Sequence, residues 1–159
     1  MTAKTVIVGC GNGLCGDDTA GLAVAAALKE VKLPEGVELV EAGMPGVGLL
    51  DILAGFDKAI IVDAVMSEGE VGSVLSFHLD ALETARPCSS LHGFSVAETL
   101  SLGMVLHPER LPKQIEFVGI EIDPANLGPG KSMSLPVQDA VAQAVQRVMD
   151  LLSQEGLSV

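Results

Sequence analysis

The sequence predicts an α/β fold, a twisted and mostly parallel five-stranded sheet with one antiparallel strand and with helices on both faces. Short apolar runs rich in β-branched residues alternate along the chain with stretches of helical periodicity, a pattern typical of such a fold. Residues 5–10 and 58–65 are apolar almost throughout, as expected for strands covered on both faces. Because parallel strands are joined by right-handed crossovers, we expect three layers, α/β/α.

The first half of the chain predicts three strands and two helices, in alternation: 5–10, 19–31, 37–40, 49–54 and 58–65. The first strand is β-branched and ends in glycines, and the first helix is rich in alanine, leucine and valine. Asp17 and Asp18 precede that helix, and carboxylates at such a position cap the helix start and complement its dipole. Asp17 could cap the helix, orient the loop or assist proton transfer, and of these roles we favour the helix cap.

The second half predicts two more strands and two more helices: 71–77, 95–102, 115–122 and a closing helix in whose first turn Pro136 stands. The strand at 71–77 follows a short turn after the third strand, so we expect it to be the antiparallel one. The closing helix carries its apolar residues at steps of three or four, which gives it one apolar face.

The composition limits the classes of function. The 159 residues include 9 Lys and Arg against 21 Asp and Glu, a formal net charge of −12. Such a charge repels phosphate backbones and anionic lipid, so we expect no nucleic-acid partner. The longest run without a charged residue, 5–16, is shorter than the about 20 residues of a membrane span, so we expect no membrane insertion. The length suits one domain, which we place at 1–159.

The cysteines suggest the cell interior. Cys10, Cys15 and Cys88 are too few for a disulfide framework, and a structural zinc site usually has a second pair of ligands. We interpret Cys10 and Cys15 as buried thiols. No secretory signal is evident, so we expect a cytoplasmic protein. No serine or cysteine stands in a recognisable nucleophile motif.

Three candidate site residues follow predicted strands: Asp18 after the first, Asp63 near the end of the third, and His92 in a later loop. In open parallel sheets, ligands bind beyond the carboxyl ends of the strands. Two carboxylates and an imidazole suit a borderline divalent metal such as nickel or zinc. An acid within an apolar strand is costly unless it is paired, hydrogen-bonded or metal-bound, which singles out Asp63. Asp18 alone could be a cap, and His92 alone a solvated loop residue.

A nucleotide-binding module is an alternative from another class. The glycines of 9–13 begin a dinucleotide fingerprint, but Leu14 stands where its last glycine belongs. Glu41 could imitate the ribose-binding acid, whereas the acids at 17–18 would oppose a pyrophosphate. A phosphate loop at 130–132 lacks its first glycine. A non-catalytic metal-binding escort protein is a third hypothesis, and we expect no nucleotide cofactor.

Residues 8–21, with the sequence Val-Gly-Cys-Gly-Asn-Gly-Leu-Cys-Gly-Asp-Asp-Thr-Ala-Gly, resemble the opening motif of the nickel–iron hydrogenase maturation endopeptidases, G-x-G-N-x-L-x-x-D-[DE]-x-x-G. The resemblance continues in the right order and spacing at 41–46, 60–64, 90–93 and 118–121, and spans nearly the whole chain.

The resemblance implies a hydrolase that removes a C-terminal extension from the precursor of the hydrogenase large subunit after nickel has been inserted. It implies that Asp18, Asp63 and His92 are the catalytic and metal-contacting residues, and that the nickel is carried by the substrate. The sequence departs from the family pattern at Glu41 and Ala42 and at Cys15, which leaves those three positions intact. We expect a monomer that meets its precursor briefly.

Overall fold

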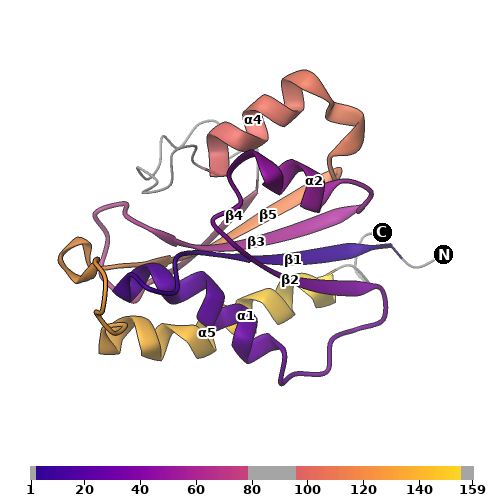
Figure 1. Cartoon of the computed structure of the whole chain (residues 1–159). Coiled ribbons are helices and arrows are strands. Elements are labelled where there is room, and N and C mark those ends of the chain that lie inside the picture. Colours follow the sequence, from indigo (N-terminus) through magenta and orange to yellow (C-terminus); the bar gives the residue numbers. More distant parts are fainter. Residues whose placement is uncertain (1–2, 79–95, 155–159) are drawn as a thin grey trace.

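The computed structural model describes residues 3–78 and 96–154, and its strands form one sheet (Figure 1). The strands are β1 (Thr5–Cys10), β2 (Val37–Gly43), β3 (Lys58–Val65), β4 (Val74–His78) and β5 (Gln114–Glu121). Their order across the sheet is β2-β1-β3-β5-β4. The first four run parallel and β4 runs antiparallel to β5, which confirms the predicted fold class.

Helices cover both faces of the sheet (Figure 1). The α-helices are α1 (Ala20–Leu28), α2 (Leu49–Leu53), α4 (Val96–Leu106) and α5 (Leu135–Ser153). Short 3-10 helices are η1 (Gly16–Thr19), η2 (Gly46–Gly48), η3 (Pro108–Arg110) and η4 (Pro124–Asn126). The pair α1 and α5 packs on one face, and α2 and α4 pack on the other. Among the described residues, no helix has both the length and the apolar character that crossing a membrane requires.

The alternation of side chains in β3 divides the core into two clusters. Ile60 and Val62 pack with α1 and α5, whereas Ala59 and Ile61 pack with α2 and α4. All four are fully or almost fully buried. Because successive side chains of a strand point to opposite faces, Asp63 faces the α2 and α4 side.

The first turn of α1 lies directly against the ends of β1 and β3 because of two glycines. A Cβ atom added at Gly21 would lie 2.1 Å from the carbonyl oxygen of Cys10 and 2.5 Å from that of Val62. A Cβ at Gly9 would lie 2.8 Å from the carbonyl oxygen of Gly21. The helix therefore begins where two neighbouring strands end, and η1 with its acids is held at that edge.

Several elements differ from their predicted bounds by one to four residues: α1 ends at Leu28 rather than at residue 31, and β2 continues to Gly43 rather than ending at residue 40. Two further differences have a clear physical cause. The antiparallel strand begins at Val74 rather than at residue 71, because the chain first turns at Gly72 (φ 91°), whose N–H donates to the carbonyl oxygen of Glu121. Helix α4 continues to Leu106 rather than ending at residue 102. It runs through Gly103, where an added Cβ would lie 2.5 Å from Leu50 of α2, so glycine permits the two helices to pack closely.

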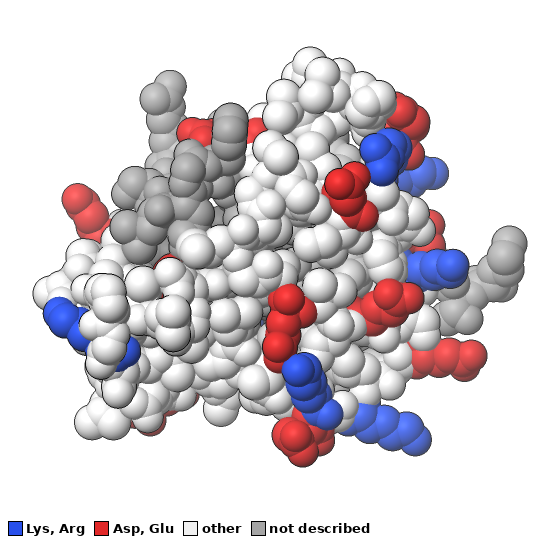
Figure 2. Space-filling model, in the orientation of Figure 1, with Lys and Arg blue, Asp and Glu red and all other residues white. Residues whose placement is uncertain are grey.

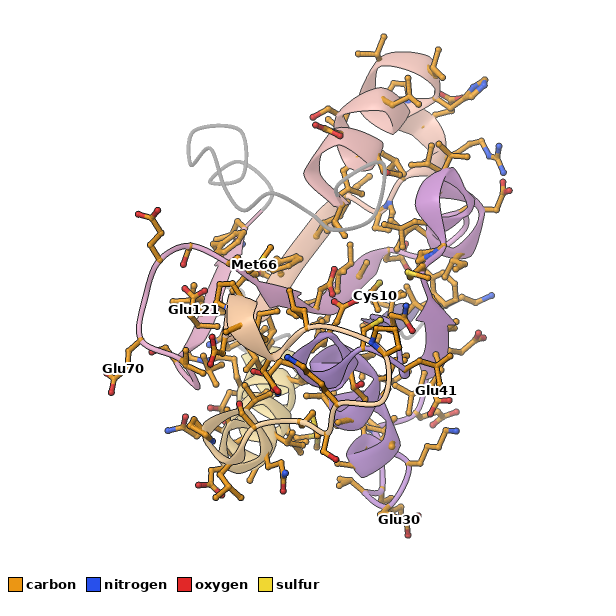
Figure 3. All side chains as sticks on the ribbon, turned by 60° about the vertical axis from the view of Figure 1, so that its left-hand side comes forward. Cys10, Glu30, Glu41, Met66, Glu70 and Glu121 are labelled. Atoms are coloured by element: carbon orange, nitrogen blue, oxygen red, sulfur yellow. The ribbon has the colours of Figure 1, made fainter. Side chains whose placement is uncertain are left out.

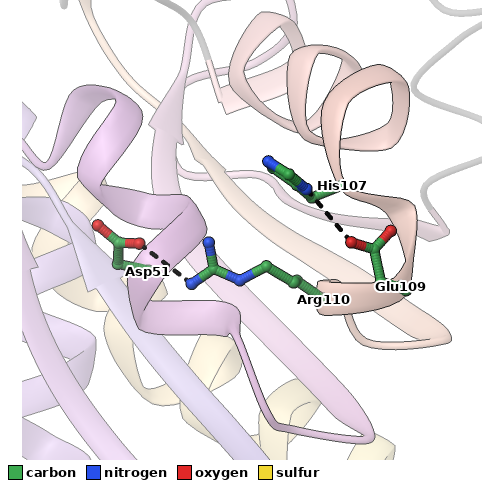
Figure 4. A network of polar contacts seen from close by, with 4 residues as sticks. All are labelled: Asp51, His107, Glu109 and Arg110. Carbon is green, nitrogen blue, oxygen red and sulfur yellow. Dashed lines mark hydrogen bonds and ion pairs between the residues drawn. The ribbon is translucent and has the colours of Figure 1, made fainter.

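Polar contacts join elements at the surface and in the interior. At the end of α4, His107 lies 3.2 Å from Glu109, and Arg110 lies 3.4 Å from Asp51 of α2 (Figure 4). The pKa of Glu109 is lowered, mainly by a backbone hydrogen bond and to a smaller extent by the contact with His107. In the interior, the buried ammonium group of Lys58 donates to the carbonyl oxygen of Leu151 in the last turns of α5, at 2.6 Å.

The close approach at Gly21 predicts an effect on stability. Gly21→Ala places a methyl group against two carbonyl oxygens, so we expect the free energy of unfolding to fall by about 1–3 kcal/mol. Gly48→Ala is the control, since an added Cβ there meets nothing within 4 Å. Its free energy of unfolding should change by less than about 1 kcal/mol. Urea titrations of both variants make the comparison, and equal losses would contradict the close approach.

Candidate functional site

Two of the three predicted site residues lie at the carboxyl edge of the parallel strands. Asp18 is in η1, directly after β1, and Asp63 is near the end of β3, the strand beside β1. Both are buried, with 4% and 6% of their surfaces exposed. His92 lies outside the described residues, as does Cys88. The described part of the chain therefore places the two acids at one edge and leaves the third member of the trio a prediction.

The carboxylate of Asp63 lies beside Cys10. Its Oδ1 accepts a hydrogen bond from the N–H of Ala64 at 2.8 Å. Cys10 ends the neighbouring strand and belongs to the same core cluster as Ile61 and Val65, which lie two positions to either side of Asp63 in β3. Burial raises the pKa of the Cys10 thiol, and the negative charge of Asp63 raises it further. Cys10 is therefore a protonated thiol at neutral pH, and its predicted burial is confirmed. Cys15, which the sequence also predicted to be buried, is only partly buried because it lies in the exposed loop after β1.

The loop that follows β1 folds around the backbone of Asp18. The N–H of Asn12 donates to the Asp18 carbonyl oxygen at 3.2 Å, and the N–H of Asp18 donates to the carbonyl oxygen of Cys15 at 3.0 Å. A Cβ at Gly11 would lie 2.2 Å from the same Asp18 oxygen. Asp18 thus sits in a tight turn that only glycine at position 11 allows.

Asp17 is not the helix cap that the sequence predicted. The starts of η1 and α1 have no capping hydrogen bond from a side chain. The fully buried Asp17 carboxylate instead accepts hydrogen bonds from the segment between β5 and α5. Its donors are the N–H of Asp123 (3.1 Å), Asn126 Nδ2 (2.9 Å), and the N–H (2.6 Å) and Oγ (2.9 Å) of Ser134. This Asp17 clamp fixes the turn that carries Asp18.

A further acid at this edge, Glu121, was not among the predicted site residues. It ends β5, is 2% exposed, and accepts hydrogen bonds from the N–H groups of Ser67 (2.8 Å) and Gly69 (3.0 Å) and from the Ser67 hydroxyl. It therefore shapes the loop that follows β3. Figure 3 shows Cys10 between Glu121 on one side and Glu41 on the other. The signal that could have found Glu121 is the one that singled out Asp63, an acid in an apolar strand.

The described histidines lie away from these acids. His78 ends the antiparallel strand, and its Nδ1 lies 2.6 Å from the buried carboxylate of Glu116, near the start of β5. His107 is in the surface network of Figure 4. Among residues 3–78 and 96–154, no three His, Cys, Asp or Glu side chains form a group that could hold a metal ion. A metal site built on Asp18 and Asp63 would therefore need a further ligand from outside the described residues, and His92 is the predicted one.

Two residues of the nucleotide alternative have partners within the chain. Lys131 Nζ, in the candidate phosphate loop, donates to the carbonyl oxygen of Ala125 at 2.9 Å. Glu41, the candidate ribose-binding acid, forms an ion pair of 2.7 Å with Lys29. Neither side chain is therefore held toward a nucleotide.

Known proteins with the same architecture act in hydrogenase maturation. A family model described as hydrogenase maturation protease matches residues 22–151. A putative hydrogenase maturation protease of Methanocaldococcus jannaschii is 30% identical over 155 residues, 92% of each chain. The hydrogenase 2 maturation protease of Escherichia coli is 28% identical, with 97% of this chain and 93% of that protein covered. The structure of the hydrogenase maturating endopeptidase HybD of E. coli has a TM-score of 0.82 at 27% identity, covering 96% of this chain and 94% of that one.

The Asp17 clamp predicts that replacing the Asp17 carboxylate by an amide of the same shape lowers the free energy of unfolding strongly. The Asp17 carboxylate accepts hydrogen bonds from four donors. In Asp17→Asn one of its oxygens becomes an NH₂ group, which cannot accept from the donors that face it, so we expect the free energy of unfolding to fall by about 2–3 kcal/mol. Asp51→Asn is the control, because Asp51 forms an exposed ion pair, and its change should be about 0.5 kcal/mol or less. Urea unfolding measures both, and equal effects would contradict the clamp.

The raised pKa of Cys10 predicts its chemical reactivity. At pH 8 the solution is below the pKa of the buried Cys10 thiol, which therefore stays protonated. Iodoacetamide should then modify the partly exposed Cys15 well before Cys10. Fragmentation of the alkylated peptide in a mass spectrometer locates the adduct. In guanidinium chloride both should react. Modification of Cys10 at the rate of Cys15 in the folded protein would show that the thiol is neither buried nor protonated.

Proposed function

Since the chain belongs to the hydrogenase maturation protease family, we propose that it removes a C-terminal extension from the precursor of a nickel–iron hydrogenase large subunit after nickel insertion. The observation that carries this proposal is the placement of two buried carboxylates, Asp18 and Asp63, at one edge of the sheet. That edge is where open parallel sheets bind their ligands.

The chemistry of the donors supports nickel as the recognised element. Two carboxylates and the imidazole of His92 would offer oxygen and nitrogen ligands that a borderline divalent cation accepts. Buried carboxylates also favour a nearby positive charge, because the low-dielectric surroundings solvate them poorly. In this proposal the nickel arrives in the precursor as part of the substrate, and the trio completes its coordination.

The reaction is hydrolysis of one peptide bond. Asp18, Asp63 and His92 hold the nickel-bearing end of the precursor so that the scissile bond lies at the carboxyl edge. A cation there polarises a carbonyl group and lowers the pKa of a coordinated water. The water adds its oxygen to the carbonyl carbon and gives up a proton, the C–N bond breaks, and the leaving amine takes up that proton. Cys10 does not compete as a nucleophile, because its thiol is protonated.

Dependence on nickel would make the cleavage a checkpoint. A precursor without nickel gives the trio no cation to bind, so its scissile bond is not held in place. Only a large subunit that has received its metal would then be shortened.

Processing of a purified precursor tests the proposal. The chain should shorten nickel-loaded precursor and leave nickel-free precursor intact, as read from the mass of the product. Asp18→Asn, Asp63→Asn and His92→Gln should each lower the rate at least roughly a hundredfold while remaining folded. Glu116→Gln is the matched control, a buried acid near the other edge of the same sheet, and should retain processing.

Two results would contradict the proposal. Undiminished cleavage by all three site variants would remove the trio from the reaction. Tight binding of the precursor by the unaltered chain with no shortening would favour a non-catalytic escort protein.

A further inference from the structure

Two neighbouring loops at the carboxyl edge have no charged side chain. We define the uncharged rim as residues 11–16, after β1, together with residues 42–48, at the end of β2 and through η2. Neither segment contains Asp, Glu, Lys, Arg or His, although the whole chain has 21 acids and 9 Lys and Arg. The N–H of Gly11 donates to the carbonyl oxygen of Gly43 at 2.8 Å, which joins the loops.

The rim exposes apolar side chains. Leu14 is 77% exposed, Met44 54% and Val47 52%. Among the described residues, most charged side chains on the face shown in Figure 2 lie to the right and below, away from the carboxyl ends of the strands. Large exposed apolar side chains grouped without charges are typical of a binding surface.

The rim adjoins Asp18 and is shaped by turns that need glycine. The N–H of Asn12 contacts the carbonyl oxygen of Asp18, so the first loop borders the candidate site directly. Gly11, Gly16 and Gly43 have φ values of 147°, 56° and 63°, which other residues rarely adopt. Glycine at these positions therefore permits the turns that present the rim's apolar side chains.

We propose that the uncharged rim binds apolar side chains of the precursor's C-terminal segment, next to the bond that is cleaved. This inference rests on the proposed function. An endopeptidase must hold the chain beside the scissile bond, and a peptide placed at Asp18 would pass over the loop that borders it. Lys131 packs beside Gly16, but its ammonium group is bound to the carbonyl oxygen of Ala125. Since the rim's own side chains carry no charge to pair with an acidic or basic side chain, the residues that gain most by binding there are apolar.

The protein provides a matched control surface. Met104, Val105 and Leu106 at the end of α4 are the same three residue types and are 44%, 80% and 57% exposed. They precede η3 and the start of β5, and so lie toward the amino ends of the strands (Figure 1). The same three side-chain types can thus be replaced near the candidate site and away from it, and the effects of the two replacements on precursor binding can be compared.

The experiment compares two triple variants of the full chain. The rim variant carries Leu14→Gln, Met44→Gln and Val47→Thr, and the control variant carries Leu106→Gln, Met104→Gln and Val105→Thr. The probe is nickel-loaded large-subunit precursor, with Kd measured on the immobilised precursor and with KM and kcat measured by product mass. Urea unfolding verifies that both variants fold, and light scattering gives their oligomeric state.

The rim variant should raise Kd and KM at least about tenfold and leave kcat within about twofold. The control variant should keep both constants within about twofold of the unaltered chain. Replacing apolar residues beside the cleaved bond of the precursor should weaken binding by the unaltered chain, but not weaken binding by the rim variant further.

Three outcomes would overturn the inference: an unchanged Kd in the rim variant, an equal rise in both variants, or a dimer of the unaltered chain that the rim variant dissociates. The last would show that a second copy covers the rim. Failure of the proposed function is separate, because an unaltered chain that binds the precursor without shortening it still reports, through Kd, whether the rim is the contact.

Discussion

A single buried carboxylate holds together segments of the protein that are more than one hundred residues apart in sequence. Asp17 accepts hydrogen bonds from Asp123, Asn126 and Ser134, at sequence separations of 106, 109 and 117. A buried carboxylate is stable only when its oxygens are satisfied, so the turn after β1 and the segment before α5 must form together. The edge of the sheet where the candidate site lies is therefore a product of the whole chain, and its turns are not independent surface loops.

The same edge depends on how closely the backbone packs. Gly9 and Gly21 let α1 begin against the ends of β1 and β3, and the parallel pairing of these strands places Asp63 beside Cys10. Asp18 follows at the next turn of the chain. Three kinds of constraint thus converge on a small region: glycine contacts, strand register and the Asp17 clamp. Each fixes a different part of the backbone at the edge of the sheet where the two acids lie.

The sequence predicted the fold well because apolar patterns report burial. The strands 5–10 and 58–65 agree with the structure to the residue, since a strand covered on both faces is apolar along most of its length. Asp17 was interpreted wrongly because a cap is a local interaction that sequence can suggest, whereas its true partners are distant in the chain. Glu121 was missed as a site-shaping residue for the same reason: its donors follow another strand. The edge position of Asp18 and Asp63 was predictable from topology alone, and the role of His92 remains a prediction.

The bond between Lys58 and the Leu151 carbonyl oxygen has a consequence for the long helix α5. An apolar stripe fixes the rotation of a helix on a sheet but hardly its translation, because a shift along the axis replaces one apolar contact by another. Here polar anchors act near both ends, with Ser134 bound to the Asp17 carboxylate at the start and Leu151 bound to Lys58 near the finish. These two hydrogen bonds, at the two ends of one helix, set the position of α5 along its axis. The helix therefore fixes the spacing between the turn at the carboxyl end of β1 and the amino end of β3.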